Sequence, residues 1–109
     1  MMQMDEITVQ QLKEKIDNDE PFLLLDVRET FETHISSLDG TVIPLDQLPD
    51  RVDEIKEKAH EEVIVLCRSG SRSAKAQKFL LENGFENVKN LKGGINEWAR
   101  VIDTSLPTY

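Results

Sequence analysis

The chain has 109 residues, of which 39% are hydrophobic and 31% charged, a balance typical of one folded domain and not of a disordered segment. Thirteen Lys and Arg against 21 Asp and Glu give a net charge of −8, which argues against binding to nucleic acid or to anionic membrane surfaces. A single cysteine excludes an internal disulfide and a structural zinc site built on several thiolates, and a free thiol favours the cytoplasm.

The first predicted elements are a short strand closed by Ile7 and a helix over residues 9–16, and the few residues before them lack the basic and apolar regions of a secretory signal. Thr8 is a suitable N-cap, and Gln11, three residues on, completes a capping box. Phe22–Leu25 then forms a continuous apolar run typical of a strand covered on both faces. The helix is expected to bury Val9, Leu12 and Ile16.

The second half of the chain continues the alternation of helices and strands. The predicted elements are a helix from Leu48 or Arg51 to about His60, a strand at Val63–Leu66, a helix from Ser73 to Asn83, a strand within Phe85–Leu91 and a helix at Ile95–Val101. Such alternation predicts an α/β domain with a mainly parallel sheet, and we expect residues 1–109 to form one domain.

The segment that carries chemistry begins where the Val63–Leu66 strand delivers Cys67 to the carboxyl edge of the sheet. Gly70 and the neighbouring serines let backbone N–H groups converge, and the following helix adds its positive end. Arg68 and Arg72 add two full charges. These features favour a thiolate at a pH below the free-thiol pKa of about 8.5. A lone cysteine ending a core strand is also typical of an inert buried residue, but the arginines and the Gly/Ser loop favour a functional one.

Five segments together resemble the motifs of the rhodanese family, and the resemblance covers nearly the whole chain. They are Cys67–Ser73, which resembles the active-site loop, Leu24–Glu29, Ile43–Leu45, Gly84–Val88 and Leu91–Trp98. The resemblance implies a five-stranded, mainly parallel sheet flanked by helices on both faces. It also implies a sulfurtransferase in which Cys67 is the catalytic residue, accepting sulfane sulfur as a persulfide and passing it on.

The same resemblance implies the roles of other residues and the partners. The expected donor is thiosulfate or a persulfidated protein, and the expected acceptor is a thiol, cyanide or a sulfur-carrier protein, with no metal or organic cofactor. Arg72 matches the loop-closing arginine of the family and is expected to matter more than Arg68 for an anionic donor. Asp26 and Arg28 are expected to support the site through an ion pair or backbone hydrogen bonds. The substrate-binding residues implied are Arg68, Ser69, Gly70, Ser71, Arg72 and Ser73.

Several alternatives stay open at this stage. A cysteine phosphatase is disfavoured because four residues separate Cys67 from Arg72, one fewer than in those enzymes, and Ser73 stands where their arginine lies. The domain is otherwise a protein-to-protein sulfur relay or a non-catalytic interaction module. The family's Gly-His-Ile motif is not matched, so His34 is assigned no catalytic role. The tail at residues 98–109 resembles that of rhodanese domains fused to adenylating enzymes of sulfur-carrier pathways, although its apolar residues are also suited to packing on the core.

Overall fold

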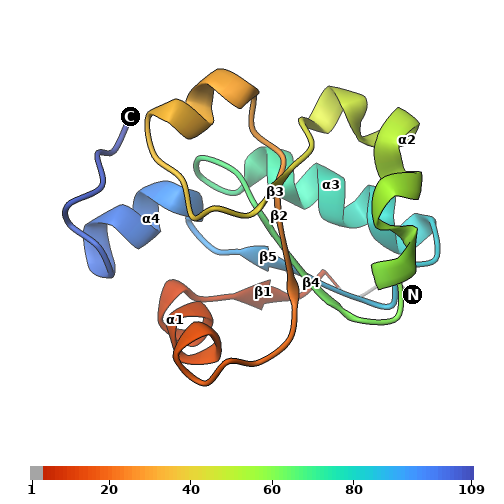
Figure 1. The fold of residues 1–109 in the computed structure, drawn as a ribbon, viewed down its shortest axis with the longest axis horizontal. Helices are drawn as coiled ribbons and strands as arrows, with labels where there is room; N and C mark the ends of the chain where they lie inside the picture. Colours follow the sequence, from red (N-terminus) through yellow and green to blue (C-terminus); the bar gives the residue numbers. More distant parts are fainter. Residues whose placement is uncertain (1–3) are drawn as a thin grey trace.

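The computed structural model describes residues 4–109, which form a five-stranded sheet with helices on both faces (Figure 1). Within this part of the chain every pairing between neighbouring strands is parallel, in the order β1-β5-β4-β2-β3. The predicted fold class is confirmed. No helix found in residues 4–109 is both long and apolar enough to cross a bilayer. The elements are β1 (Glu6–Ile7), α1 (Val9–Asp17), β2 (Leu23–Asp26), the 3₁₀ helix η1 (Thr30–His34), β3 (Thr41–Val42), η2 (Leu45–Gln47), α2 (Leu48–Arg51), η3 (Val52–Lys58), β4 (Glu62–Leu66), α3 (Ser71–Glu82), β5 (Asn87–Leu91) and α4 (Gly94–Val101).

The central strand β4 separates two apolar clusters, since successive side chains of a strand point to opposite faces. Val63 and Val65 pack with residues of α2, η3 and α3 on one face. Ile64 and Leu66 pack with residues of α1 and α4 on the other. All four side chains are fully buried, which is why this strand is a continuous apolar run. Figure 1 shows α3 and α2 on one side of the sheet and α1 on the other.

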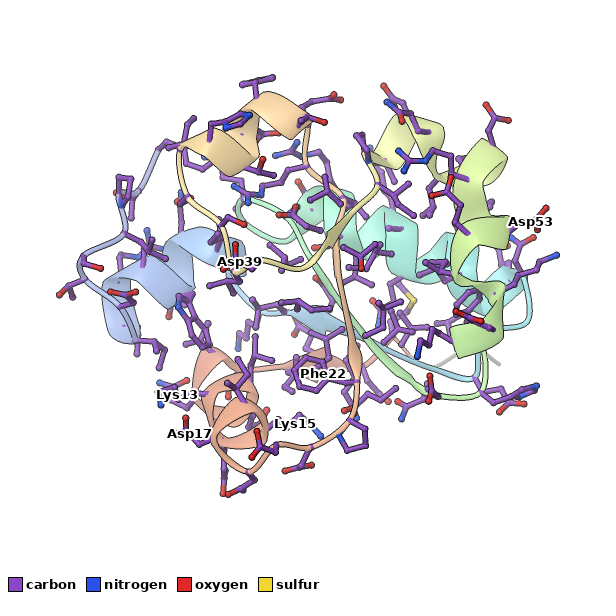
Figure 2. The ribbon with its side chains drawn as sticks, in the orientation of Figure 1. Lys13, Lys15, Asp17, Phe22, Asp39 and Asp53 are labelled. Atoms are coloured by element: carbon purple, nitrogen blue, oxygen red, sulfur yellow. The ribbon has the colours of Figure 1, made fainter. Side chains whose placement is uncertain are left out.

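The first helix confirms its predicted cap but not all of its predicted core. The Thr8 side chain accepts a hydrogen bond from the backbone N–H of Gln11, whose own side chain accepts from Thr8 N–H, as in a capping box. The prediction that Ile16 is buried is wrong, because its side chain lies in the last turn, leads into exposed residues 17–21 and is itself 41% exposed. Figure 2 shows Lys13 and Asp17 on the outer face of α1, where they form an ion pair.

Other boundaries shift in ways that affect the site. The predicted helix over 48–60 is divided into the single turn of α2 and the 3₁₀ helix η3. The helix α3 begins at Ser71, two residues earlier than predicted, because Gly70 at φ 116° completes the turn after Cys67. Arg72 and Ser73 therefore belong to the first turn of α3 and not to the loop. The strand β5 begins at Asn87, inside the predicted range.

Candidate functional site

Cys67 follows the last residue of β4 and is 1% exposed. Its Sγ accepts hydrogen bonds from the backbone N–H of Gly70 at 3.1 Å and of Ser73 at 3.4 Å. The Ser73 hydroxyl lies 3.3 Å from the same sulfur. The left-handed Gly70 turns the loop so that these donors converge on Sγ from the start of α3. The sulfur therefore sits in a cradle of donors at the carboxyl edge of the sheet.

The same donors set the charge state of the cysteine. Burial raises the pKa of the Cys67 thiol, whereas hydrogen bonds from the Ser73 hydroxyl and from the backbone N–H groups of Ser73, Gly70 and Ser69 lower it by more. The net result is a thiol pKa below its ordinary value. Because the thiolate is the nucleophilic form of cysteine, this arrangement favours chemistry at Sγ.

The start of α4 holds the loop from behind. The backbone N–H of Ile95 donates to the carbonyl of Cys67 at 2.9 Å, and that of Asn96 donates to the carbonyl of Arg68 at 3.2 Å. The backbones approach so closely that a Cβ on Gly94 would lie 2.4 Å from the Arg68 carbonyl oxygen. Gly94 also has a φ of +63°, which side chains rarely adopt. A glycine is required here by the position of the active-site loop.

We expect the Gly94→Ala variant to lose about 2–4 kcal/mol of unfolding free energy, because the left-handed conformation and the backbone clash add together. The matched control is Gly84→Ala, where φ is +90° but no atom lies within 4 Å of the new Cβ. It is expected to lose only about 1 kcal/mol, from conformation alone. Urea unfolding of both variants measures the difference. Equal losses in the two variants would show that the close approach to the loop carries no cost.

Arg72 does not point its guanidinium freely toward the sulfur but forms a two-pronged ion pair with Glu32 of η1. The Nη1–Oε2 and Nη2–Oε1 distances are 2.7 and 2.8 Å. The Tyr109 hydroxyl donates to the same carboxylate at 2.8 Å. The hydrogen bonds from Arg72 are the main cause that lowers the pKa of Glu32 to about 2. Part of the charge that the sequence suggested for the donor is therefore engaged in holding η1 against α3.

Asp26 and Arg28 form the predicted ion pair in a fully buried position beneath the site. Arg28 Nη2 lies 2.7 Å from Asp26 Oδ2, and it also donates to the carbonyl of Ser36 at 2.8 Å. Arg28 Nη1 donates to the Tyr109 hydroxyl at 3.0 Å. The Arg68 guanidinium lies over the Tyr109 ring, 5.1 Å from its centroid. The tail at Tyr109 thus joins the strand-end ion pair to the rim of the loop.

The remaining predicted site residues lie on the surface. Arg68, Ser69 and Ser71 are exposed at the mouth of the cradle. His34 is exposed at the end of η1, away from any contact with Cys67 described for residues 4–109. Three residues of the site were missed from the sequence: Glu32, Asn90 and Tyr109. Glu32 is 40 positions from Arg72 and 77 from Tyr109, so no local spacing indicated these contacts.

Known proteins resemble this chain along most of its length. Residues 8–101 match the family described as Rhodanese-like domain. The chain is 35% identical to the adenylyltransferase and sulfurtransferase MOCS3-2 of Zea mays over 94% of its own length and 23% of that protein. It is 37% identical to the putative sulfurtransferase YtwF of Bacillus subtilis, over 89% of this chain and 92% of YtwF. The chain therefore spans less than a quarter of the maize protein but nearly all of YtwF.

A solved structure shows the same fold. The structure of a rhodanese-like domain protein from Staphylococcus aureus superposes with a TM-score of 0.81 and 31% sequence identity. The match covers 97% of this chain and 99% of the staphylococcal one. The strand-loop-helix that carries Cys67 lies within this shared fold.

Proposed function

The chain belongs to the Rhodanese-like domain family, and from that premise we propose a sulfurtransferase that carries sulfane sulfur as a persulfide on Cys67. The observation that supports this most is the cradle of donors at Sγ, made by the backbone N–H groups of Gly70 and Ser73 and by the Ser73 hydroxyl. Donors that stabilise a thiolate also stabilise the anion of a persulfide built on it.

The proposed reaction has two steps and returns the cysteine to its starting form. The Cys67 thiolate attacks the outer sulfur of thiosulfate, a new S–S bond forms, and sulfite leaves with the electron pair of the bond that breaks. An acceptor nucleophile then attacks the outer sulfur of the persulfide and releases the thiolate. No external oxidant or reductant is required, and we propose that no metal or organic cofactor takes part.

The direct test is the intact mass of the purified protein after incubation with thiosulfate or another sulfane donor. We expect the mass to rise by one sulfur atom and the gain to disappear after treatment with dithiothreitol. A chelator should leave the reaction unchanged. Protein that remains unmodified across several donors would contradict the proposal.

Arg68 is proposed to attract the anionic donor, because it is exposed at the rim of a protein whose net charge is −8. We expect Arg68→Ala to weaken thiosulfate use by about 1–2 kcal/mol, roughly 5- to 30-fold in kcat/KM. Raised salt should reproduce part of this loss in the wild type by screening. The control is Arg100→Ala, which removes the same charge from the exposed outer side of α4. Equal effects of the two substitutions would place donor binding elsewhere.

The acceptor is proposed to be a protein of a sulfur-carrier pathway. Cys67 is the only cysteine, so the sulfur must leave to an external nucleophile. The similarity to an adenylyltransferase and sulfurtransferase favours an adenylated carrier. Transfer of labelled sulfur from the persulfide to such a carrier should then exceed transfer to cyanide, glutathione or reduced thioredoxin. Discharge by the small molecules alone would favour a general thiosulfate sulfurtransferase. Either route needs a reduced thiol, which is the basis for proposing a cytoplasmic location.

A further inference from the structure

Asn90 of β5 is a buried polar residue beside Cys67 that the proposed reaction does not use. Its Nδ2 donates to the carbonyl of Gly70 at 3.1 Å, and its Oδ1 accepts from the Ser73 hydroxyl at 2.5 Å. A carbonyl oxygen can only accept, so the amide must turn its NH₂ toward Gly70 and its oxygen toward Ser73. The orientation of the amide therefore fixes Ser73 as the donor in the second contact.

The Ser73 hydroxyl has one proton and three acceptors within reach. Its Oγ lies 2.5 Å from Asn90 Oδ1, 3.1 Å from the carbonyl oxygen of Gly70 and 3.3 Å from Cys67 Sγ. While the proton points to Asn90, the hydroxyl offers only lone pairs to the sulfur. That arrangement suits a protonated thiol, whose S–H donates to Ser73 Oγ. When the thiol loses its proton to solvent, the hydroxyl must leave Asn90 and turn toward Sγ to stabilise the anion.

We propose that Asn90 is a positioning residue that acts through Ser73, holding the hydroxyl proton away from Cys67 and so opposing ionisation of the thiol. This deepens the proposed function, on which it rests for the choice of Cys67 as the reactive sulfur. The site thereby combines backbone donors that favour the anion with one side-chain contact that competes for the hydroxyl. The sulfur is ionised less readily than its cradle alone would allow.

The charged groups around the cysteine do not take part in this competition. Arg72 is near enough for its charge to interact with Cys67, and its guanidinium is bound to Glu32. The Asp26–Arg28 pair after β2 is likewise neutral as a unit, and Arg68 lies at the exposed rim. The side-chain hydrogen bonds of Asn90 go to Ser73 and Gly70, so replacing it leaves these charges in place.

The test is the ultraviolet absorbance of the thiolate as a function of pH, measured without any sulfur donor. Asn90→Ala is expected to lower the titration midpoint of Cys67 by at least about half a pH unit, because the freed hydroxyl turns to the sulfur. Ser73→Ala is expected to raise the midpoint. In the Ser73→Ala background, Asn90→Ala should cause no further shift. Asn90→Leu, which fills a similar volume, carries the same expectation if the alanine variant does not fold.

The outcomes separate this inference from the proposed function. An unchanged or raised midpoint in the single Asn90 variants would overturn it, as would an equal shift without the Ser73 hydroxyl. A lowered midpoint that depends on Ser73 supports it even if thiosulfate fails to load the protein, in which case only the proposed sulfur transfer is wrong. Normal loading with no shift would leave sulfur transfer standing and remove the role of Asn90.

Discussion

The Cys67→Ser variant is expected to show no gain of sulfur with any donor, a loss of at least on the order of 10³-fold in the loading rate. A serine hydroxyl ionises far less readily than a thiol, and the cradle at Gly70 and Ser73 cannot make up that difference. Intact mass before and after thiosulfate measures the result. The wild-type rate should also fall as the pH drops below the lowered thiol pKa, since only the thiolate attacks.

The fold should tolerate this change, which makes the loss interpretable. The serine oxygen would find the donors of Gly70 and Ser73 already in place, so we expect a change of less than about 1 kcal/mol in unfolding free energy. Urea unfolding of the variant is the control. A folded Cys67→Ser protein that still gains sulfur would show that the sulfur binds at another residue.

The sequence predicted the elements that have strong local patterns. The apolar run at Val63–Leu66 and the capping box at Thr8 both describe interactions within a few residues, and the structure has both. The strand β3 was not located, because two residues, Thr41–Val42, are too few to show alternation. The 3₁₀ character of η3 was also missed, since its apolar spacing is that of any helix packed on a sheet.

The site divides in the same way between local and distant contacts. The strand, the loop and the helix that surround Cys67 are contiguous, so their motif was visible in the sequence. Arg72 was recognised as a charge near the sulfur, but its partner Glu32 lies 40 positions away in a segment of ordinary polar residues. Tyr109 was expected only to pack the tail, yet its hydroxyl joins Arg28 and Glu32. Such pairings arise from the topology and leave no periodic signal.

The Glu32–Arg72 pair is expected to contribute much of the stability of the site, which distinguishes Arg72 from a simple donor-binding residue. The Glu32 side chain is 7% exposed and accepts from Arg72, from Tyr109 and from the N–H of Glu29. Arg72→Ala would leave this carboxylate buried with half its partners removed. We expect a loss of about 2–4 kcal/mol in unfolding free energy at neutral pH, together with weaker sulfur loading. Unchanged stability with impaired loading would instead assign Arg72 to the donor alone.

The pH dependence of unfolding gives the sharper test of the same pair. The pKa of Glu32 is lowered from 4.5 to about 2 in the folded protein, so its contribution is fully present above about pH 5. As the pH falls from there toward 2, the unfolded chain takes up the proton first, and about 3 kcal/mol is lost progressively. Glu32→Gln should flatten this acid limb. The control Glu54→Gln removes an exposed carboxylate paired with Arg51 and should leave the limb unchanged. If Glu32→Gln loses stability on acidification as steeply as the wild type, other carboxylates dominate and the pair is not the acid-sensitive element of the site.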